Sequence, residues 1–221
     1  MPHFPGTVES ASSLDAYRSP CRHSARRIVG SKSAGAGEGF RLRHKSMSRV
    51  PMGRTRIMSP ERVQRTLRRL AYETIEHNRG AGSLELFGIQ QSGVPLAHAV
   101  AEEINVAEGT DLQAHDLDVT PFRDDRPDLE PPTPPPHERT VMDRDVILVD
   151  DVVFTGRTAR AALDAVLQYG RPQSIQLVVL IDRGHREYPI QPDCTGRRLQ
   201  TKHEEEVVVE TDGEFAVYVD D

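Results

Sequence analysis

The chain has 221 residues, of which 37% are hydrophobic, and a formal net charge of −6. This length is enough for one sizeable domain with its own core, and the overall acidic charge argues against indiscriminate nucleic-acid binding. No apolar run approaches the length of a membrane span, and two cysteines are too few for a disulfide framework, so we expect a cytoplasmic protein with no membrane partner.

The first 50 residues differ in composition from the rest of the chain. They carry nine Lys/Arg and three Asp/Glu, so their formal charge is +6 and that of the remainder is −12. Ser, Gly and Arg predominate there, and apolar periodicity is weak. We predict a disordered basic extension over residues 1–54, or an upstream extension from a misplaced start codon, with an organelle transit peptide as the less favoured alternative. Residues 55–221 form the predicted folded domain.

Residues 59–80 predict the first helix. Ser59 is a suitable N-cap, Pro60 suits the first helical position, and Gly80 suits the end of the helix. The predicted buried face comprises Val63, Leu67, Leu70, Ala71, Thr74 and Ile75.

Strands and helices alternate along the next part of the chain. A buried strand at 84–89 is followed by a helix at 93–104 and an alternating strand at 112–120. The segment 126–138 contains six prolines after Arg126, so it predicts a loop rather than a helix or a central strand.

The second half continues the alternation. A strand begins at Asp145, a helix covers 157–169, a buried strand covers 174–182, and short strands at 205–210 and 215–219 close the chain. The predicted inward side chains of the helix are Ala159, Ala162, Leu163, Val166 and Leu167. Alternating strands and helices predict a parallel sheet with helices on both faces.

The stretch DVILVDDVVFTGRTARAAL, residues 145–163, carries the most specific signal in the chain. Its VILV segment is apolar on both faces, as a central parallel strand requires. Asp150 and Asp151 follow at the carboxyl end of that strand, where ligands of parallel sheets bind. Two carboxylates there suit the hydroxyl groups of a ribose or a hydrated Mg²⁺, but they repel a phosphate.

Thr155, Gly156, Arg157 and Thr158 then begin the next helix. Free backbone N–H groups, two hydroxyls and the helix dipole form a phosphate cradle at such a helix start, and glycine lets the backbone approach the anion. The sequence lacks the Gly-Lys-Ser/Thr core of a Walker A loop. A ligand with a ribose and a terminal phosphate would suit both the acids and the cradle. The simpler interpretation is structural: two solvated acids at a strand end, followed by a Thr-capped helix.

This run resembles the motif that binds phosphoribosyl pyrophosphate (PRPP) in type I phosphoribosyltransferases. The resemblance extends over about residues 57–219 and is most specific to the PyrR family at LIDRGHRE, residues 180–187. The segments that are similar to PyrR are RTLRRLAYETIEHNRG, RDD at 123–125, VILVDDVVFTGRTARAALDAV, GRPQSIQLVVLIDRGHREYPI and GRRLQTKHEEEVVV.

The resemblance implies an α/β protein with the type I phosphoribosyltransferase fold: a central, mainly parallel sheet with helices on both faces, a small hood and a mobile flap loop at about 123–140. It also implies uracil phosphoribosyltransferase activity, which converts uracil and PRPP to UMP and diphosphate, and nucleotide-sensitive binding of pyr leader mRNA. Asp150 and Asp151 would hold the ribose hydroxyls and contact Mg²⁺ indirectly, through PRPP and water. The segment implied to bind the 5′-phosphate comprises Val152, Val153, Phe154, Thr155, Gly156, Arg157 and Thr158.

A second anion site is implied at the turn formed by Gln90, Gln91, Ser92 and Gly93. In the family this turn holds pyrophosphate with backbone N–H groups and usually carries a basic residue, which this sequence lacks. We therefore expect PRPP binding to persist and turnover to be weak. Arg123 is implied to reach the pyrophosphate when the flap closes, although an exposed charge cluster is the alternative.

The resemblance places the uracil pocket after the strand at 174–182. Backbone groups of Ile181, Asp182, Arg183 and Gly184 would read the base edge. The alternative function is a salvage phosphoribosyltransferase for another base, without RNA regulation. The family also favours a homodimer or a higher homo-oligomer.

Basic and aromatic side chains on the first helix predict an RNA-binding surface. Arg65, Arg68, Arg69 and Tyr72 lie opposite its apolar face, at about 100° per residue. Guanidinium groups around an aromatic ring bind phosphates and stack on unpaired bases, so single-stranded or loop RNA fits better than a duplex. The family usually has Thr and His where this chain has Arg68 and Tyr72, which predicts altered RNA specificity, and a solvated charged face is the alternative. The remaining predicted RNA-binding residues are His185, Arg186 and Lys202.

Overall fold

The structure is a computed structural model that describes residues 53–125 and 140–221. The chain divides into two compact units, residues 1–47 and 48–221, and everything described belongs to the second. All but the last two residues of the predicted basic extension, and the proline-rich segment at 126–138, lie outside the described residues.

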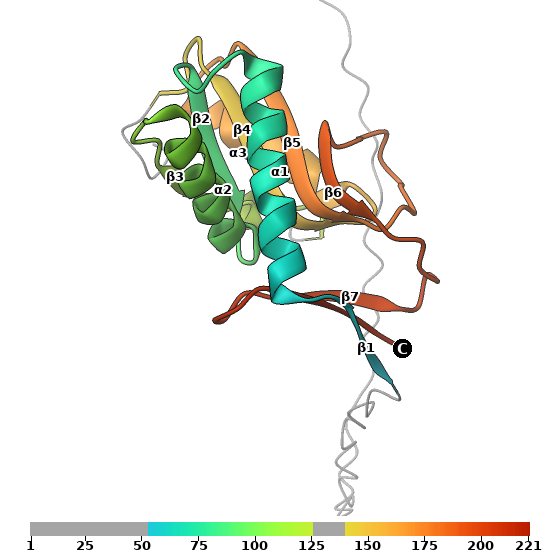
Figure 1. The fold of residues 1–221 in the computed structure, drawn as a ribbon. Coiled ribbons are helices and arrows are strands. Elements are labelled where there is room, and N and C mark those ends of the chain that lie inside the picture. Colours follow the sequence, from blue (N-terminus) through green and yellow to red (C-terminus); the bar gives the residue numbers. More distant parts are fainter. Residues whose placement is uncertain (1–52, 126–139) are drawn as a thin grey trace, which may run out of the picture. The chain divides into compact units, whose positions relative to one another are not determined.

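The described residues form two sheets and three helices, with two short 3₁₀ turns (Figure 1). In chain order the elements are β1 (Arg54–Met58), α1 (Pro60–Asn78), β2 (Leu84–Ile89), α2 (Gly93–Glu108), β3 (Ala114–Leu117), a 3₁₀ turn (Thr120–Phe122), β4 (Asp145–Val153), α3 (Arg157–Val166), a 3₁₀ turn (Leu167–Tyr169), β5 (Ser174–Asp182), β6 (Cys194–Arg198), β7 (Glu206–Glu210) and β8 (Ala216–Asp220).

The main sheet confirms the predicted parallel architecture. Its five strands run in the order β3-β2-β4-β5-β6, and every neighbouring pair is parallel. β4 lies in the centre, where its VILV segment is fully buried, because helices cover both faces of the sheet.

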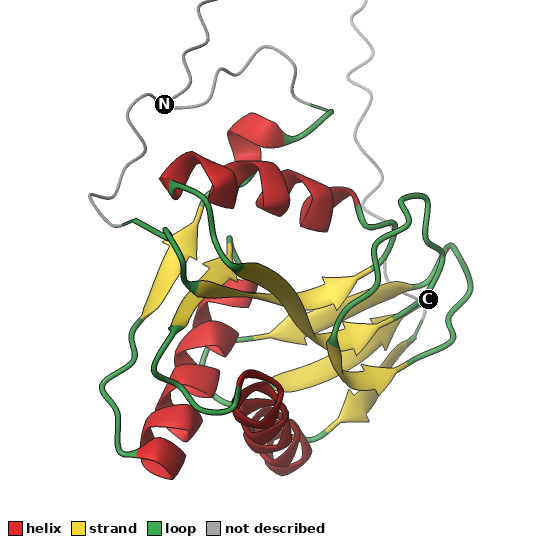
Figure 2. Cartoon of the chain, turned by 90° about the horizontal axis from the view of Figure 1, so that it is seen from above, coloured by secondary structure: helices red, strands yellow, loops and turns green. Residues whose placement is uncertain are grey.

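The helices divide between the two faces of the sheet, as Figure 2 shows. The apolar sides of α1 and α2 form one core with alternate residues of the strands, and α3 forms the other. Five of the six residues predicted to be buried on α1 are buried, and Ile75 is partly buried. On α3 the prediction is wrong for Leu167, which is 50% exposed, because the α-helix ends at Val166 and a 3₁₀ turn changes the direction of the next side chains.

A second sheet of three antiparallel strands, in the order β1-β8-β7, fits the small hood that the resemblance implies. Neither β1 nor β6 is predicted from the sequence. Both are short strands of mixed polarity, in which Met58 and Cys194 are the fully buried residues. Their strand conformation depends on pairing with a neighbouring strand rather than on their own sequence pattern: β1 pairs with the distant β8 and β6 with the preceding β5.

Two predicted strand boundaries change in the structure. β3 covers only 114–117, because the Asp118 carboxylate accepts a hydrogen bond from the Thr120 N–H (2.8 Å) and starts a turn. β4 continues three residues beyond Asp150, alongside β5, so the two acids lie within the last part of the strand.

Candidate active site

The predicted site residues lie at the topological switch point of the sheet, between β2 and β4. β2 and β4 are neighbours; the chain leaves β2 through α2 toward β3, and leaves β4 through α3 toward β5. The loops after the two strands therefore separate, and a crevice opens at the carboxyl ends of the strands, as in other open α/β sheets. The turn predicted to hold pyrophosphate, Gln90–Gly93, follows β2 and is called the pyrophosphate turn below. Asp150, Asp151 and the predicted cradle lie at the end of β4.

Glycine allows these two segments to touch. A Cβ atom on Gly93, at the start of α2, would lie 2.4 Å from the Val149 carbonyl oxygen and 3.2 Å from the Cα of Asp150. A Cβ atom on Gly88 would lie 2.4 Å from the Cα of Val94. Because no side chain fits at either position, the turn after β2 lies directly against β4 beside the acids.

Asp150 and Asp151 have different surroundings. Asp150 is buried, with 7% of its surface exposed, and its carboxylate accepts a hydrogen bond from the Asp151 N–H (3.0 Å). Burial, and then the charge of Asp151, raise the pKa of Asp150 well above its ordinary value. Asp151 is half-buried, and its Oδ1 accepts a hydrogen bond from the Val152 N–H at 2.7 Å. The second carboxylate is thus the one more open to a ligand.

The turn after β4 has the unpaired donors that a phosphate cradle needs. Within the described part of the chain, the backbone N–H groups of Thr155, Gly156 and Thr158 donate to no acceptor. Gly156 has φ of 89°, a left-handed conformation that favours glycine, and it is the N-cap of α3. Three free donors at a helix start suit an anion.

The pyrophosphate turn also has backbone N–H groups without an acceptor, but it has no cationic side chain. Among the described residues, the N–H groups of Gln91, Ser92 and Gly93 find no acceptor, whereas the Gln90 N–H donates to the Leu117 carbonyl at 3.1 Å. The peptide bond between Gln90 and Gln91 is cis. The backbone for a second anion site is therefore present, while the positive charge has to come from elsewhere.

Two arginines beside the crevice form ion pairs within the protein. Arg123 donates through Nε and Nη2 to the Asp125 carboxylate, at 2.8 and 2.9 Å. The backbone N–H of Arg157 lies in the cradle, but its guanidinium binds Asp124 and Glu187. Both side chains stay partly exposed while they form these ion pairs: Arg123 is 40% exposed and Arg157 is 48% exposed.

The residues predicted to read the base are largely engaged within the protein. Ile181 and Asp182 belong to β5 and pair with β4 and β6. The Arg183 N–H donates to the Val153 carbonyl at 3.2 Å, and the Gly184 N–H donates to the Asp182 carboxylate at 3.0 Å. Gly184 is the first exposed residue after the strand, so it is the member of this group that lies open to a base.

Arg183 also organises a ring cluster that is not predicted from the sequence. Its buried guanidinium lies 4.0 Å from the centre of the Phe154 ring and donates to the carbonyls of Lys202 and His203. The rings of Phe154, His185 and His203 have centroids 5.3–5.7 Å apart. His203 lies 49 residues after Phe154, so only the folded chain shows that it lies beside the cradle segment.

The structure separates the predicted RNA-binding residues of α1 into two groups. Arg65 is exposed and Tyr72 is 55% exposed. Arg68 forms an ion pair with Glu103 of α2 at 2.9 Å, and Arg69 donates to the carbonyls of Thr195 and Gly196 at 3.2 and 2.7 Å. The second pair therefore fastens α1 to neighbouring elements.

The predicted RNA-binding residues of the later loops divide in the same way. Arg186 is partly buried, pairs with Asp182 at 2.7 Å and donates to the carbonyls of Phe154 and Ile190. It thus holds the cradle segment in place, which differs from the exposed role expected of it. The Lys202 side chain is 84% exposed, and His185 is exposed with Nε2 2.8 Å from the Thr201 carbonyl oxygen.

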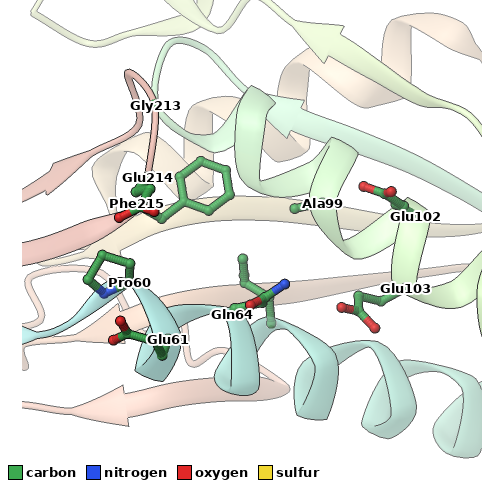
Figure 3. Close-up of a pocket in the computed structure, with 10 residues that line it drawn as sticks. Pro60, Glu61, Gln64, Ala99, Glu102, Glu103, Gly213, Glu214 and Phe215 are labelled. Atoms are coloured by element: carbon green, nitrogen blue, oxygen red, sulfur yellow. The ribbon is translucent and has the colours of Figure 1, made fainter.

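A pocket of about 360 Å³ lies between the start of α1, the middle of α2 and the β7–β8 turn (Figure 3). It contains none of the predicted site residues. Its acidic side chains would repel a phosphate, so it does not compete with the crevice as a PRPP site. The pocket is lined by Pro60, Glu61, Gln64, Leu67, Ala99, Glu102, Glu103, Gly213, Glu214 and Phe215.

The parallel sheet, the crevice at its switch point and the paired acids before an N–H cradle together define a type I phosphoribosyltransferase. The family model of the phosphoribosyl transferase domain matches residues 55–212. A protein of Microcystis aeruginosa named bifunctional protein PyrR is 46% identical over 166 residues, which cover 73% of this chain and 94% of that protein. The chain belongs to the PyrR family.

A further relative agrees with this assignment, and solved structures share the fold. The pyrimidine operon regulatory protein of Lactococcus lactis subsp. cremoris is 42% identical over 76% of this chain and 98% of its own length. The hypoxanthine phosphoribosyltransferase of Trypanosoma cruzi shares the fold, with a TM-score of 0.58 at 14% identity, over 76% of this chain and 91% of that chain. The hypoxanthine-guanine enzyme of Leishmania tarentolae, solved with GMP, has a TM-score of 0.56 at 15% identity, over 77% and 99%.

None of the described helices combines the length and the apolar character needed to span a bilayer. The described residues also contain no group of three or more His, Cys, Asp or Glu side chains arranged for a metal ion.

Proposed function

We propose that this protein transfers the phosphoribosyl group of PRPP to uracil, and that it also binds pyr leader mRNA in a nucleotide-sensitive manner. One observation supports the first activity above the others: the free N–H groups of two turns converge beside Asp150 and Asp151 at the switch point of the sheet. The relatives named bifunctional protein PyrR and pyrimidine operon regulatory protein support the pyrimidine assignment and the regulatory activity.

In the proposed reaction, the bond between C1′ of the ribose and the pyrophosphate oxygen breaks, a bond from C1′ to N1 of uracil forms, and N1 loses its proton. The sugar carries positive charge in the transition state. Asp151, with its open carboxylate, would bind the ribose hydroxyls and stabilise that charge, while the cradle at Thr155–Thr158 holds the 5′-phosphate. The enzyme needs no nucleophile, because positioning and charge stabilisation carry the catalysis.

The residues present fit a Mg²⁺ ion that arrives with PRPP. Carboxylate oxygens are suitable ligands for Mg²⁺, and it keeps most of its coordination for water and phosphate oxygens. Two acids without a third protein ligand match this pattern better than they match a resident metal. When bound, Mg²⁺ would neutralise charge on the pyrophosphate; Asp150 and Asp151 would contact it through water and the ribose oxygens.

For RNA, the exposed members of the predicted surface are the candidates. Arg65 and Tyr72 on α1 and Lys202 in the later loop offer charge and a ring to an unpaired segment. A homodimer or larger assembly would bring two such surfaces together. Light scattering of the purified protein measures its mass in solution and so tests this oligomeric state.

A product assay tests the enzyme. The full chain is incubated with PRPP, Mg²⁺ and uracil, hypoxanthine or guanine, and the nucleotides are separated and quantified. We expect UMP, and we expect the Asp151→Asn protein to form far less, which excludes a contaminating activity. IMP or GMP without UMP would instead support salvage of another base, and no product with any base would contradict transferase activity.

A binding assay tests the regulator. The affinity for the cognate leader RNA is measured with and without UMP, at one salt concentration, beside a scrambled RNA of equal length. We expect the leader to bind more tightly than the scrambled RNA and UMP to change that affinity. Equal affinity for both RNAs would remove the regulatory proposal and leave the transferase unaffected.

A further inference from the structure

The Arg157 side chain connects three segments at the entrance of the crevice. Its Nη2 lies 2.7 Å from Glu187 Oε2 and its Nη1 binds the Asp124 carboxylate, while the centre of the Tyr188 ring lies 5.1 Å from the guanidinium. Tyr188 in turn donates its hydroxyl to Asp124 at 3.1 Å. We name these four residues, Asp124, Arg157, Glu187 and Tyr188, the Arg157 cluster.

The cluster is attached to the cradle by the backbone as well. The N–H groups of Glu187 and Tyr188 both donate to the Thr155 carbonyl, at 2.9 and 3.0 Å. A Cβ atom on Gly156 would lie 3.3 Å from the Tyr188 Cβ, so this tyrosine packs directly on the cradle turn. These contacts join the loop after β5 directly to the predicted phosphate cradle.

The segment before residue 126 is held from the same helix. Arg160, one turn after Arg157, donates to the Phe122 carbonyl at 3.0 Å. Together the two arginines fix residues 122–124 beside the first turn of α3. Arg123, predicted to reach the pyrophosphate, lies within this fixed segment.

We infer that Arg157 is a positioning residue: its side chain holds the Arg123 segment and the loop after β5 against the phosphate cradle, and thereby increases the affinity for PRPP. The inference rests on the proposed binding of PRPP, but not on which base accepts the phosphoribosyl group. The planar guanidinium holds two carboxylates in fixed directions through its rigid set of N–H donors, whereas the rotatable donors of an ammonium group on a flexible stem fix neither direction.

The partly exposed ion pairs of the cluster contribute little to global stability, because water screens them. If Arg157 mainly stabilises the fold, its substitution should lower the melting temperature. If it positions the binding groups, its substitution should lower PRPP affinity at a similar melting temperature. Arg54 provides a matched control: it pairs with Glu210 and Asp220, its guanidinium lies 4.0 Å from the centre of the Tyr218 ring, and it is 41% exposed, but it belongs to the small sheet.

The experiment measures PRPP affinity by titration calorimetry with Mg²⁺, and the melting temperature, for the full chain and its variants. We expect Arg157→Gln to weaken PRPP binding about tenfold, since misplaced binding groups lose affinity, and Arg54→Gln to leave it unchanged at a similar melting temperature. Equal PRPP affinity for these two variants would overturn the inference.

Two more variants separate positioning from simple attraction between Arg157 and a phosphate. Arg157→Lys keeps the positive charge, and Asp124→Asn removes a negative charge near the phosphate site. Charge alone predicts normal binding for the first and tighter binding for the second, whereas positioning predicts weaker binding for both. Normal binding by Arg157→Lys, or tighter binding by Asp124→Asn, would overturn the inference even if Arg157→Gln does not fold. A wild-type chain that binds no PRPP contradicts the proposed function itself, and the inference with it.

Discussion

Asp150 and Asp151 are adjacent in the chain, but folding gives them different ionisation properties. Burial raises the pKa of Asp150, so the folded protein favours its protonated form. The contribution of this carboxyl to stability is therefore complete below its ordinary pKa of 3.8 and is lost as the pH rises through the raised value. At neutral pH a charged Asp150 costs stability, which is a common property of functional sites.

We predict that Asp150→Asn stabilises the ligand-free protein at high pH. The amide has nearly the same shape and still accepts the hydrogen bond from the Asp151 N–H, but it never carries a charge. The melting temperature of the variant should exceed that of the wild type by about 3 °C at about pH 8 and by less at about pH 5. Calorimetric scans across this pH range measure the difference in melting temperature between the variant and the wild type. A difference that does not change with pH would contradict the raised pKa of Asp150.

Asp151→Asn should reduce turnover on the order of a hundredfold, because the amide no longer stabilises positive charge on the ribose. The melting temperature should stay within about 2 °C, since Asn can accept the Val152 N–H bond in the same way. Steady-state kinetics and thermal scans of the same preparation test both parts. A large loss of stability together with activity would indicate a structural role instead.

Among the elements, α1 serves two purposes at once. Its apolar face packs in the core, and Arg68 and Arg69 fasten its outer side to α2 and β6. Arg62 and Arg65 point outward from the first half of the helix and are exposed. A charge reversal of Arg69 would therefore confuse loss of RNA binding with loss of the contact between α1 and β6.

The paired variant Arg62→Glu and Arg65→Glu is the cleaner test of this element. We expect it to weaken leader-RNA binding at least tenfold, because two cations that we propose to contact RNA phosphates become anions, and to leave PRPP affinity unchanged. The paired variant Arg79→Glu and Arg171→Glu, at exposed arginines after α1 and before β5, makes the same change in net charge and is the control. Filter binding or fluorescence anisotropy at one salt concentration measures the effect, and RNA affinity equal to that of the control would place the RNA elsewhere.

At the scale of the whole molecule, the small sheet joins the two ends of the described fold. β1 pairs with β8, so the first strand is held by the last. Met58 is buried in the core, and Arg197 of β6 donates to the Ile57 carbonyl at 2.8 Å. β1 is therefore an integral part of the described fold, and the boundary near residue 54 stays a prediction.

Two truncations test this boundary. Removal of residues 1–52 should change the melting temperature by less than about 2 °C and preserve PRPP affinity. Removal of residues 1–58 also deletes β1 and the buried Met58 side chain, and should lower the melting temperature by roughly 5–10 °C. Thermal scans compare the two with the full chain; a large loss from the shorter truncation would show that the basic segment supports the fold.

The sequence alone predicts those features that depend on neighbouring residues. The VILV strand and the buried face of α1 follow from local periodicity, and the structure agrees with both. The phosphate cradle at Gly156 follows from turn residues and stays a prediction. The strands β1 and β6 escape prediction because each is short, has mixed polarity and contains one buried residue, so neither shows an apolar pattern of its own.

The tertiary structure decided what the charged side chains do. From the sequence, Arg69, Arg157 and Arg186 are cations available to a ligand, whereas the folded chain places carbonyl and carboxylate oxygens around each of them. The same holds for the contact between Gly93 and β4, which places the turn after β2 beside Asp150. Local patterns record which side of an element is buried; the partner of a long polar side chain depends on residues that only folding brings near.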